Sequence, residues 1–114
     1  MPLLKIATNR DLDEAAAAHL ARDASQAVAE MLGKPERYVM VDVAGGRVMT
    51  FAGTDEPLAY LELKSIGLPA ERTAEFSAAL CEMVCTRLRV PKDRIYIEFA
   101  DAERHMWGWN GGTF

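Results

Sequence analysis

Few residues in this sequence belong to the types that build metal sites or disulfide frameworks. The 114 residues include two cysteines and two histidines. His19 and His105 are isolated, and no Cys/His pair has the spacing of metal ligands, so we expect no bound metal. Cys81 and Cys85 lie four residues apart in an expected helix, where a disulfide is geometrically awkward. We expect both to be small, buried, reduced thiols.

The sequence also lacks long apolar runs and runs of basic residues. Its apolar stretches are short and interrupted by charge, so we expect no transmembrane segment. Lys and Arg are scattered and the formal net charge is −4, which argues against a nucleic-acid partner, because phosphates require a basic patch. Residues 1–5 lack the basic leader, apolar run and cleavage site of a signal peptide. We therefore expect a cytoplasmic protein with neither a nucleic-acid nor a membrane partner.

The composition is that of an ordinary globular domain. Half of the residues are hydrophobic and 26% are charged, which excludes a disordered chain. The length fits one domain, residues 1–114. Because a chain of this size buries well under three quarters of its surface, an oligomer interface would add to its stability.

The apolar pattern predicts a first strand–helix–strand unit. A short apolar strand is expected at residues 3–7. A helix with one apolar face follows; we expect it to begin at Asp11, with Glu14 completing a capping box. Gly33 is expected to end this helix. Residues 38–43 are rich in β-branched side chains and predict the second strand.

A second unit follows after a turn. Gly45-Gly46 predicts a tight turn, and residues 47–51 are expected to return as a further strand. The second unit consists of a strand at residues 58–63, a helix between Pro69 and Pro91, and a strand at residues 95–99. The glycine-rich tail, residues 106–114, is compatible with a short edge strand.

An internal repeat supports this division, because residues 33–41 resemble residues 90–98. Each half is a βαβ unit, which gives two parallel strands joined by a right-handed crossover. Two units side by side form a four-stranded sheet with both helices on one face. The other face then has nothing to cover it, and oligomerisation would cover it.

Five short stretches occur in one order along the chain. They are Met1-Pro2 opening a strand, Gly33-Lys34-Pro35, Ser65-Ile66-Gly67, Asp93-Arg94-Ile95-Tyr96-Ile97 and the ending at residues 108–114. Together they resemble the macrophage migration inhibitory factor (MIF) family of the tautomerase superfamily. The resemblance implies an α+β fold, in which two βαβ units form a four-stranded mixed sheet with two helices on one face. It also implies a homotrimer with active sites between subunits, and keto–enol tautomerisation of an α-keto acid such as phenylpyruvate without a cofactor.

Pro2 is the candidate catalytic residue. Once Met1 is removed, its secondary amine is the chain terminus. An α-amine has a pKa of about 7.7–8.0, and burial lowers the pKa of an amine. A neutral amine can take a proton from the carbon beside a carbonyl and return it at the other end of the enol. The resemblance implies this role; without it, Pro2 simply begins a strand.

The resemblance implies further contacts with substrate. Lys34 would hold the substrate carboxylate or polarise its carbonyl, although a lysine beyond a helix end also suits the helix dipole. Ile66 would contact substrate through its backbone amide, or is a plain apolar residue at a strand end. Tyr96 would line the pocket of the neighbouring subunit.

Aromatic residues are expected to form a wall for a phenyl-bearing substrate. The candidates are Tyr38, Trp109 and Phe114. A strand tyrosine is usually a core or interface residue, which is the alternative for Tyr38.

Two departures from the family pattern stand out. The Cys-x-x-Cys of the best-known vertebrate members is replaced at residues 58–61, which excludes thiol–disulfide chemistry there. Glu98 stands where those members carry an asparagine beside the pocket tyrosine. An unpaired carboxylate there would repel an anionic substrate, which predicts weak turnover of phenylpyruvate-like acids.

Two alternatives to a tautomerase remain open. One is a cytokine-like receptor ligand that leaves the cell without a signal peptide and whose pocket is incidental. The other is a different superfamily reaction, decarboxylation or dehalogenation, in which Glu98 would activate water.

Overall fold

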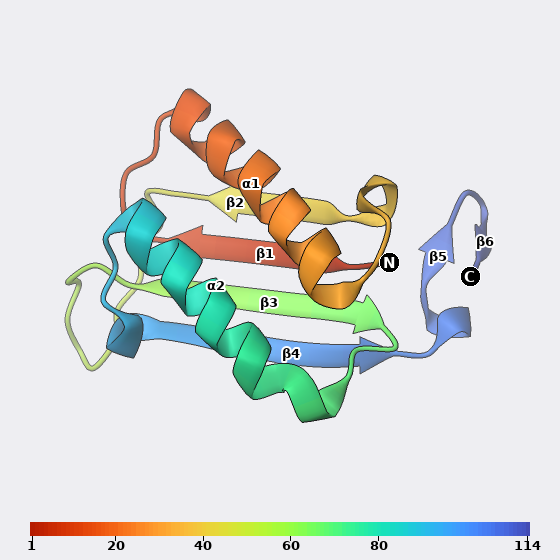
Figure 1. Cartoon of the computed structure of the whole chain (residues 1–114). Coiled ribbons are helices and arrows are strands. Elements are labelled where there is room, and N and C mark those ends of the chain that lie inside the picture. Colours follow the sequence, from red (N-terminus) through yellow and green to blue (C-terminus); the bar gives the residue numbers. More distant parts are fainter.

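The computed structural model describes residues 1–114 and contains two long helices and a four-stranded sheet (Figure 1). The elements are β1 (Leu3–Thr8), α1 (Glu14–Leu32), β2 (Met40–Ala44), β3 (Ala59–Ile66), α2 (Thr73–Leu88), β4 (Ile95–Ala102), β5 (Gly108–Trp109) and β6 (Gly112–Thr113). The strand order is β2-β1-β3-β4. β1 pairs parallel with β2 and antiparallel with β3, and β3 pairs parallel with β4. The expected mixed sheet of two βαβ units is therefore confirmed.

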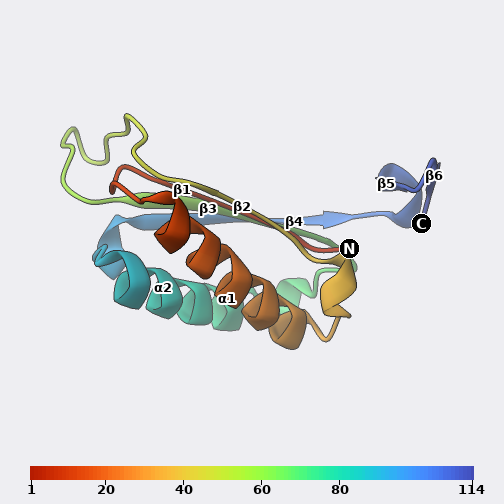
Figure 2. The same ribbon diagram turned by 90° about the horizontal axis from the view of Figure 1, so that it is seen from above.

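Both helices pack on one face of this sheet, as Figure 2 shows. Alternate residues of β1 and β3 point into the layer between sheet and helices. Each helix turns toward this layer a stripe of buried apolar residues that are four positions apart. Fully buried members of this core are Leu4, Ile6, Ala24, Val28, Leu61, Leu63 and Val84. Burying a side chain such as Leu or Val stabilises the fold by about 1.5–3 kcal/mol. This layer therefore holds the sheet on which the candidate site is built.

The opposite face of the sheet carries a row of charged residues. The strand register places Asp42, Lys5, Glu62 and Glu98 side by side across all four strands. Lys64 Nζ lies 3.6 Å from Glu62 Oε2 on the same face. No helix covers these residues (Figure 2), so this face is polar along its middle row.

The ends of α1 differ in part from expectation. The expected start at Asp11 is wrong: α1 begins at Glu14, and Asp13 is the N-cap. Asp13 has extended backbone angles, and its Oδ1 accepts a hydrogen bond of 2.7 Å from the N–H of Ala16. Gly33 ends α1 as expected, with a left-handed φ of 62°.

The expected strand at residues 47–51 is also wrong. Gly46 donates its N–H to Arg10 O at 2.8 Å, and Arg47 donates its N–H to Thr8 O at 3.0 Å. These bonds tie the chain to the end of β1, so it does not fold back along β2. Only an isolated bridge between Phe51 and Thr54 forms in this stretch. In the tail, β5 and β6 pair with each other in a separate two-stranded sheet, so the tail is not an edge strand of the main sheet.

The two halves repeat each other closely. A 3-10 turn follows Pro35 at Glu36–Tyr38, and another follows Pro91 at Lys92–Arg94. In each half the edge strand then starts beside the strand of the same unit, with Leu3 opposite Met40 and Ala59 opposite Ile95. Met40 and Tyr96 each follow the proline of their turn by five residues, and each is 67% exposed.

Two further expectations concern the helices. Cys81 and Cys85 are free thiols on α2, half-buried rather than fully buried, because the buried stripe of α2 runs through Leu80 and Val84. Neither long helix has the length and hydropathy that crossing a membrane requires.

Candidate active site

Pro2 lies at the start of β1, between β2 and β3. Its side chain is fully buried, and its carbonyl accepts a hydrogen bond of 3.0 Å from Met40 N–H. The next residue, Leu3, pairs with both β2 and β3 and so holds the chain beside Pro2 from both sides. The N-terminus, the C-terminus and the tail strands all lie at this end of the sheet (Figure 1).

A hollow of about 420 Å³ opens over Pro2. Its lining residues come from the N-terminus, the turn before β2 and the tail: Met1, Pro2, Leu3, Arg37, Tyr38, Val39, Met40, Trp107, Gly108, Trp109 and Phe114. The size is within the range of about 300–1,000 Å³ that is typical of small-molecule sites. The structure thus brings four of the expected site residues together: Pro2, Tyr38, Trp109 and Phe114.

The three expected aromatic residues form one cluster. Trp109 and Phe114 stack with ring centroids 5.2 Å apart and planes at 15°. Tyr38 meets both rings edge-on, each at 5.8 Å. Such offset and edge-to-face contacts stabilise aromatic groups beyond simple burial. The stacked rings and the edge-on Tyr38 form an apolar wall of the hollow that Pro2 also lines, which suits an aromatic group.

Positive charge surrounds the amino terminus. Burial lowers the pKa of the Met1 α-ammonium, and the charges of Lys34 and Arg104 lower it further. Lys34 follows directly on Gly33 at the end of α1, where its N–H donates to Ala29 O at 3.0 Å. Arg37 Cζ lies 4.7 Å from the ring centroid of Tyr38. An amine at this place is therefore shifted toward its neutral form, and an anion is attracted to it.

Ile66 lies at the end of β3, which runs antiparallel to β1. Because Leu3 pairs with Lys64, the end of β3 lies beside the start of β1. The Ile66 side chain is 6% exposed and is not among the residues that line the hollow. The structure therefore places Ile66 beside the start of β1 and outside the lining of the hollow.

Tyr96 and Glu98 lie far from Pro2 within one chain. They belong to the first half of β4, at the end of the sheet away from the N-terminus. Tyr96 packs on Phe51 at a centroid distance of 4.7 Å and lines a separate apolar hollow of about 290 Å³. Glu98 is not a free carboxylate, because the Tyr60 hydroxyl lies 3.0 Å from its Oε2.

Several residues of the hollow have no counterpart in the sequence expectations. Arg37, Met40 and Trp107 line it. The charge of Arg104 lowers the pKa of the Met1 α-ammonium, which is also part of the hollow. A signal for Arg37 exists in the sequence, because it directly precedes Tyr38 in the turn after Lys34-Pro35. Arg104 and Trp107 have no local signal, since only the folding of the tail brings them to Pro2.

Comparisons with known proteins agree with this architecture. The family model for macrophage migration inhibitory factor (MIF) matches residues 1–114. A macrophage migration inhibitory factor homolog of Brugia malayi is 41% identical over 115 residues, covering 100% of this chain and 99% of that protein. A crystal structure of a homologue from Prochlorococcus marinus is 44% identical, covers 98% of each chain and superposes with a TM-score of 0.93. The factor of Mus musculus is 38% identical over 91 residues, 79% of each chain.

A four-stranded mixed sheet of two βαβ units, with two helices on one face, is the tautomerase-superfamily fold. The full-length match to the family model and the 41% identity to a full-length relative identify one family within this superfamily. The chain belongs to the macrophage migration inhibitory factor family.

Proposed function

We propose that this protein is a tautomerase that interconverts the keto and enol forms of an α-keto acid such as phenylpyruvate. Family membership supports an isomerase-type activity in general terms. The observation that carries the finer proposal is the position of Pro2, buried beneath an aromatic hollow and beside positive charge. That place suits an amine that must be neutral near pH 7.

The amine forms when Met1 is removed, because in the Met1-Pro2 peptide the proline nitrogen belongs to an amide. Burial and the charges of Lys34 and Arg104 lower the pKa of the terminal amine at Met1, and the same influences act on a proline terminus one residue further on. The neutral Pro2 nitrogen takes the proton from the carbon beside the keto group. The prolinium then protonates the oxygen and completes the enol.

The aromatic residues of the hollow, and Lys34 and Ile66 beside it, bind and orient the substrate. Lys34 attracts the carboxylate and stabilises the negative charge that develops on the enolate oxygen. The stacked pair Trp109 and Phe114, with Tyr38 at its edge, receives the phenyl group. Ile66 offers its backbone amide. None of these steps requires a metal ion or an organic cofactor.

We further propose a homotrimer in which Tyr96 and Glu98 of each subunit reach the Pro2 hollow of a neighbour. The high exposure of Tyr96 and Met40 at the two edge strands supports it, since each is 67% exposed. The sheet face without helices and the projecting tail add surface that a second copy would cover (Figure 2). Glu98 would then meet the substrate with the Tyr60 hydroxyl bound to it.

A cytokine-like ligand is the second candidate, favoured by the names of the relatives, which are macrophage migration inhibitory factors and their homologs. A receptor-binding assay tests this second candidate, and the tautomerase is tested by its dependence on a free Pro2 amine. Intact mass identifies protein with and without Met1, and both forms are assayed with phenylpyruvate. Activity only in the form without Met1 supports the tautomerase; equal activity in both forms rules out Pro2 as the base.

A further inference from the structure

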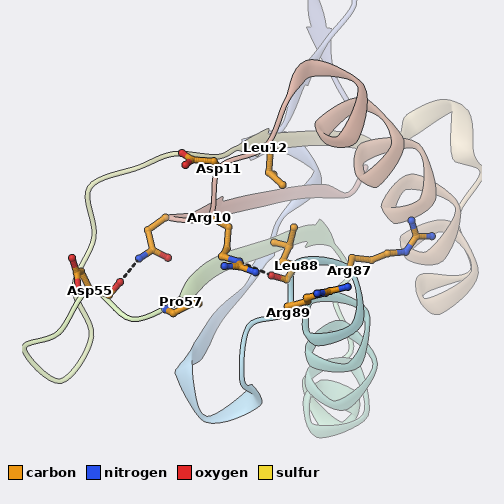
Figure 3. Close-up of a pocket in the computed structure, with 9 residues that line it drawn as sticks. Arg10, Asp11, Leu12, Asp55, Pro57, Arg87, Leu88 and Arg89 are labelled. Carbon is orange, nitrogen blue, oxygen red and sulfur yellow. Dashed lines mark hydrogen bonds between the residues drawn. The ribbon is translucent and has the colours of Figure 1, made fainter.

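The largest hollow of the molecule lies at the end of the sheet opposite Pro2 and has no part in the proposed reaction. Its volume is about 640 Å³, and it lies between the end of β1 and the end of α2 (Figure 3). The lining residues are Asn9, Arg10, Asp11, Leu12, Asp55, Pro57, Arg87, Leu88 and Arg89. β1 separates it from Pro2 by roughly 20 Å, from six residues at about 3.3 Å each. Its size suits a small molecule, and its walls are mostly polar.

Arg10 is held in place from three directions. Its Nε donates to Leu88 O at 3.0 Å, as Figure 3 shows. Its N–H donates to Thr8 Oγ1 at 3.1 Å, and its carbonyl accepts from Gly46 N–H at 2.8 Å. The ion pairs of the chain involve other residues, so the guanidinium is oriented but has no carboxylate partner.

Arg89 occupies a position where the fold alone favours glycine. It ends α2 in the left-handed region with a φ of 55°, and the corresponding residue at the end of α1 is Gly33, with a φ of 62°. A side chain is strained in this conformation. Arg89 is fixed between buried Leu88 and Val90, makes no ion pair, and lines the hollow. Strained non-glycine residues cluster at functional sites.

The hollow also contains negative charge, which narrows the kind of ligand. Asp11 and Asp55 contribute carboxylates, and the carboxyl end of α2 is the negative end of its dipole. Arg87 is not available as a ligand, because it points toward α1 in Figure 3 and pairs with Asp23. Arg10 and Arg89, which make no ion pair, thus line the same hollow as two carboxylates. Guanidinium groups bind phosphate and sulfate oxygens in a bidentate way, and carboxylates accept hydrogen bonds from hydroxyl groups.

We propose that this hollow binds a phosphate or sulfate ester of a hydroxyl-rich small molecule, with Arg10 and Arg89 on the oxyanion and Asp11 and Asp55 on the hydroxyl groups. The site is independent of the Pro2 chemistry. Its failure in experiment would leave the tautomerase proposal untouched, and the reverse also holds.

Calorimetric titration of the whole protein tests the proposal with four probes: a hexose monophosphate, the matching hexose monosulfate, the free hexose and inorganic phosphate. We expect at least one ester to bind more tightly than the free hexose and inorganic phosphate. Arg10→Gln and Arg89→Gly are each expected to weaken the binding at least about tenfold, the loss of a charge-assisted contact. Arg22→Gln is the matched control, since Arg22 is an exposed arginine on α1 that does not line the hollow.

Arg89→Gly separates ligand binding from structure. Glycine is the preferred residue in the left-handed position, so this variant is expected to melt at a higher temperature while it binds the ester less tightly. Turnover of phenylpyruvate is expected to be unchanged. The proposal is overturned if neither ester binds above inorganic phosphate, or if Arg89→Gly binds as the unmodified protein does.

Discussion

The Tyr60 hydroxyl lies 3.0 Å from Glu98 Oε2 and 3.1 Å from Glu62 Oε1, and so sits between two carboxylates on adjacent strands. It has one proton and donates it to one carboxylate at a time. Glu98, which from the sequence alone would be expected as an unpaired carboxylate beside the substrate, is therefore held toward Tyr60 by a hydrogen bond to a charged group.

Glu98 is expected to limit the turnover of carboxylate substrates. Replacing it by Gln removes a negative charge that repels the substrate carboxylate. The expected gain is about 1 kcal/mol, or roughly fivefold in kcat/KM for phenylpyruvate, because solvent screens the pair. An esterified substrate is the control and is expected to change little. Lower activity on both substrates would instead make Glu98 a catalytic or positioning group. It would then favour the alternative reaction, decarboxylation or dehalogenation, in which Glu98 activates water.

Tyr60 gives the protein an alkaline titration step. Burial and the two carboxylates raise the pKa of Tyr60 from 10.0 to about 12. Since the folded pKa lies above the unfolded one, the stability that Tyr60 contributes is complete below pH 10 and is lost as the pH rises through 12. Unfolding of the unmodified protein and of Tyr60→Phe is to be compared across this range. Their difference is expected to shift in favour of Tyr60→Phe as the pH rises; a constant difference would contradict the assignment.

The N-cap of α1 at Asp13 can be tested by substitution, with the nearby Asp11 as the control. Asp13→Ala removes the acceptor of the Ala16 N–H and is expected to destabilise the protein by about 1 kcal/mol. Asp11→Ala removes the same charge two residues earlier and is expected to change stability by less than about 0.5 kcal/mol. Denaturant unfolding measures both. Equal losses would mean that charge near the helix start matters rather than the hydrogen bond.

The homotrimer is expected at micromolar concentration. Sedimentation equilibrium should give three times the 12.6 kDa mass of the chain. Tyr96→Ala is expected to lower phenylpyruvate turnover even in trimers of unchanged mass, because its ring would belong to the neighbour's pocket. A monomeric mass for active protein would end the account of a shared site.

Much of the fold could be predicted because its information is local. The apolar spacing of α1 and α2, the glycine at residue 33 and the apolar, β-branched strand segments are each local signals, and together they define the βαβ units. The error at residues 47–51 has a non-local cause, since Gly46 and Arg47 donate to carbonyls at the end of β1. The Gly45-Gly46 turn signal is local, so it cannot show that these hydrogen bonds to β1 form in place of a hairpin with β2.

Some residues of the site could likewise be predicted from the sequence, and others could not. Tyr38, Trp109 and Phe114 were found by their type and by the resemblance, and they do lie over Pro2. The link between Tyr60 and Glu98 spans 38 residues and depends on the register of β3 and β4. The cytoplasmic location and the roles of all the site residues, Pro2 included, stay predictions.

Insertion of one alanine between Met1 and Pro2 tests the central claim most directly. The insertion converts the proline nitrogen into an amide after Met1 is removed, while the sheet and the aromatic wall stay in place. Intact mass verifies the processed terminus, and sedimentation verifies the assembly. We expect kcat/KM for phenylpyruvate to fall by roughly 100-fold or more, the usual contribution of a general base. Full activity in the insertion variant would contradict the assignment of Pro2 as the catalytic base.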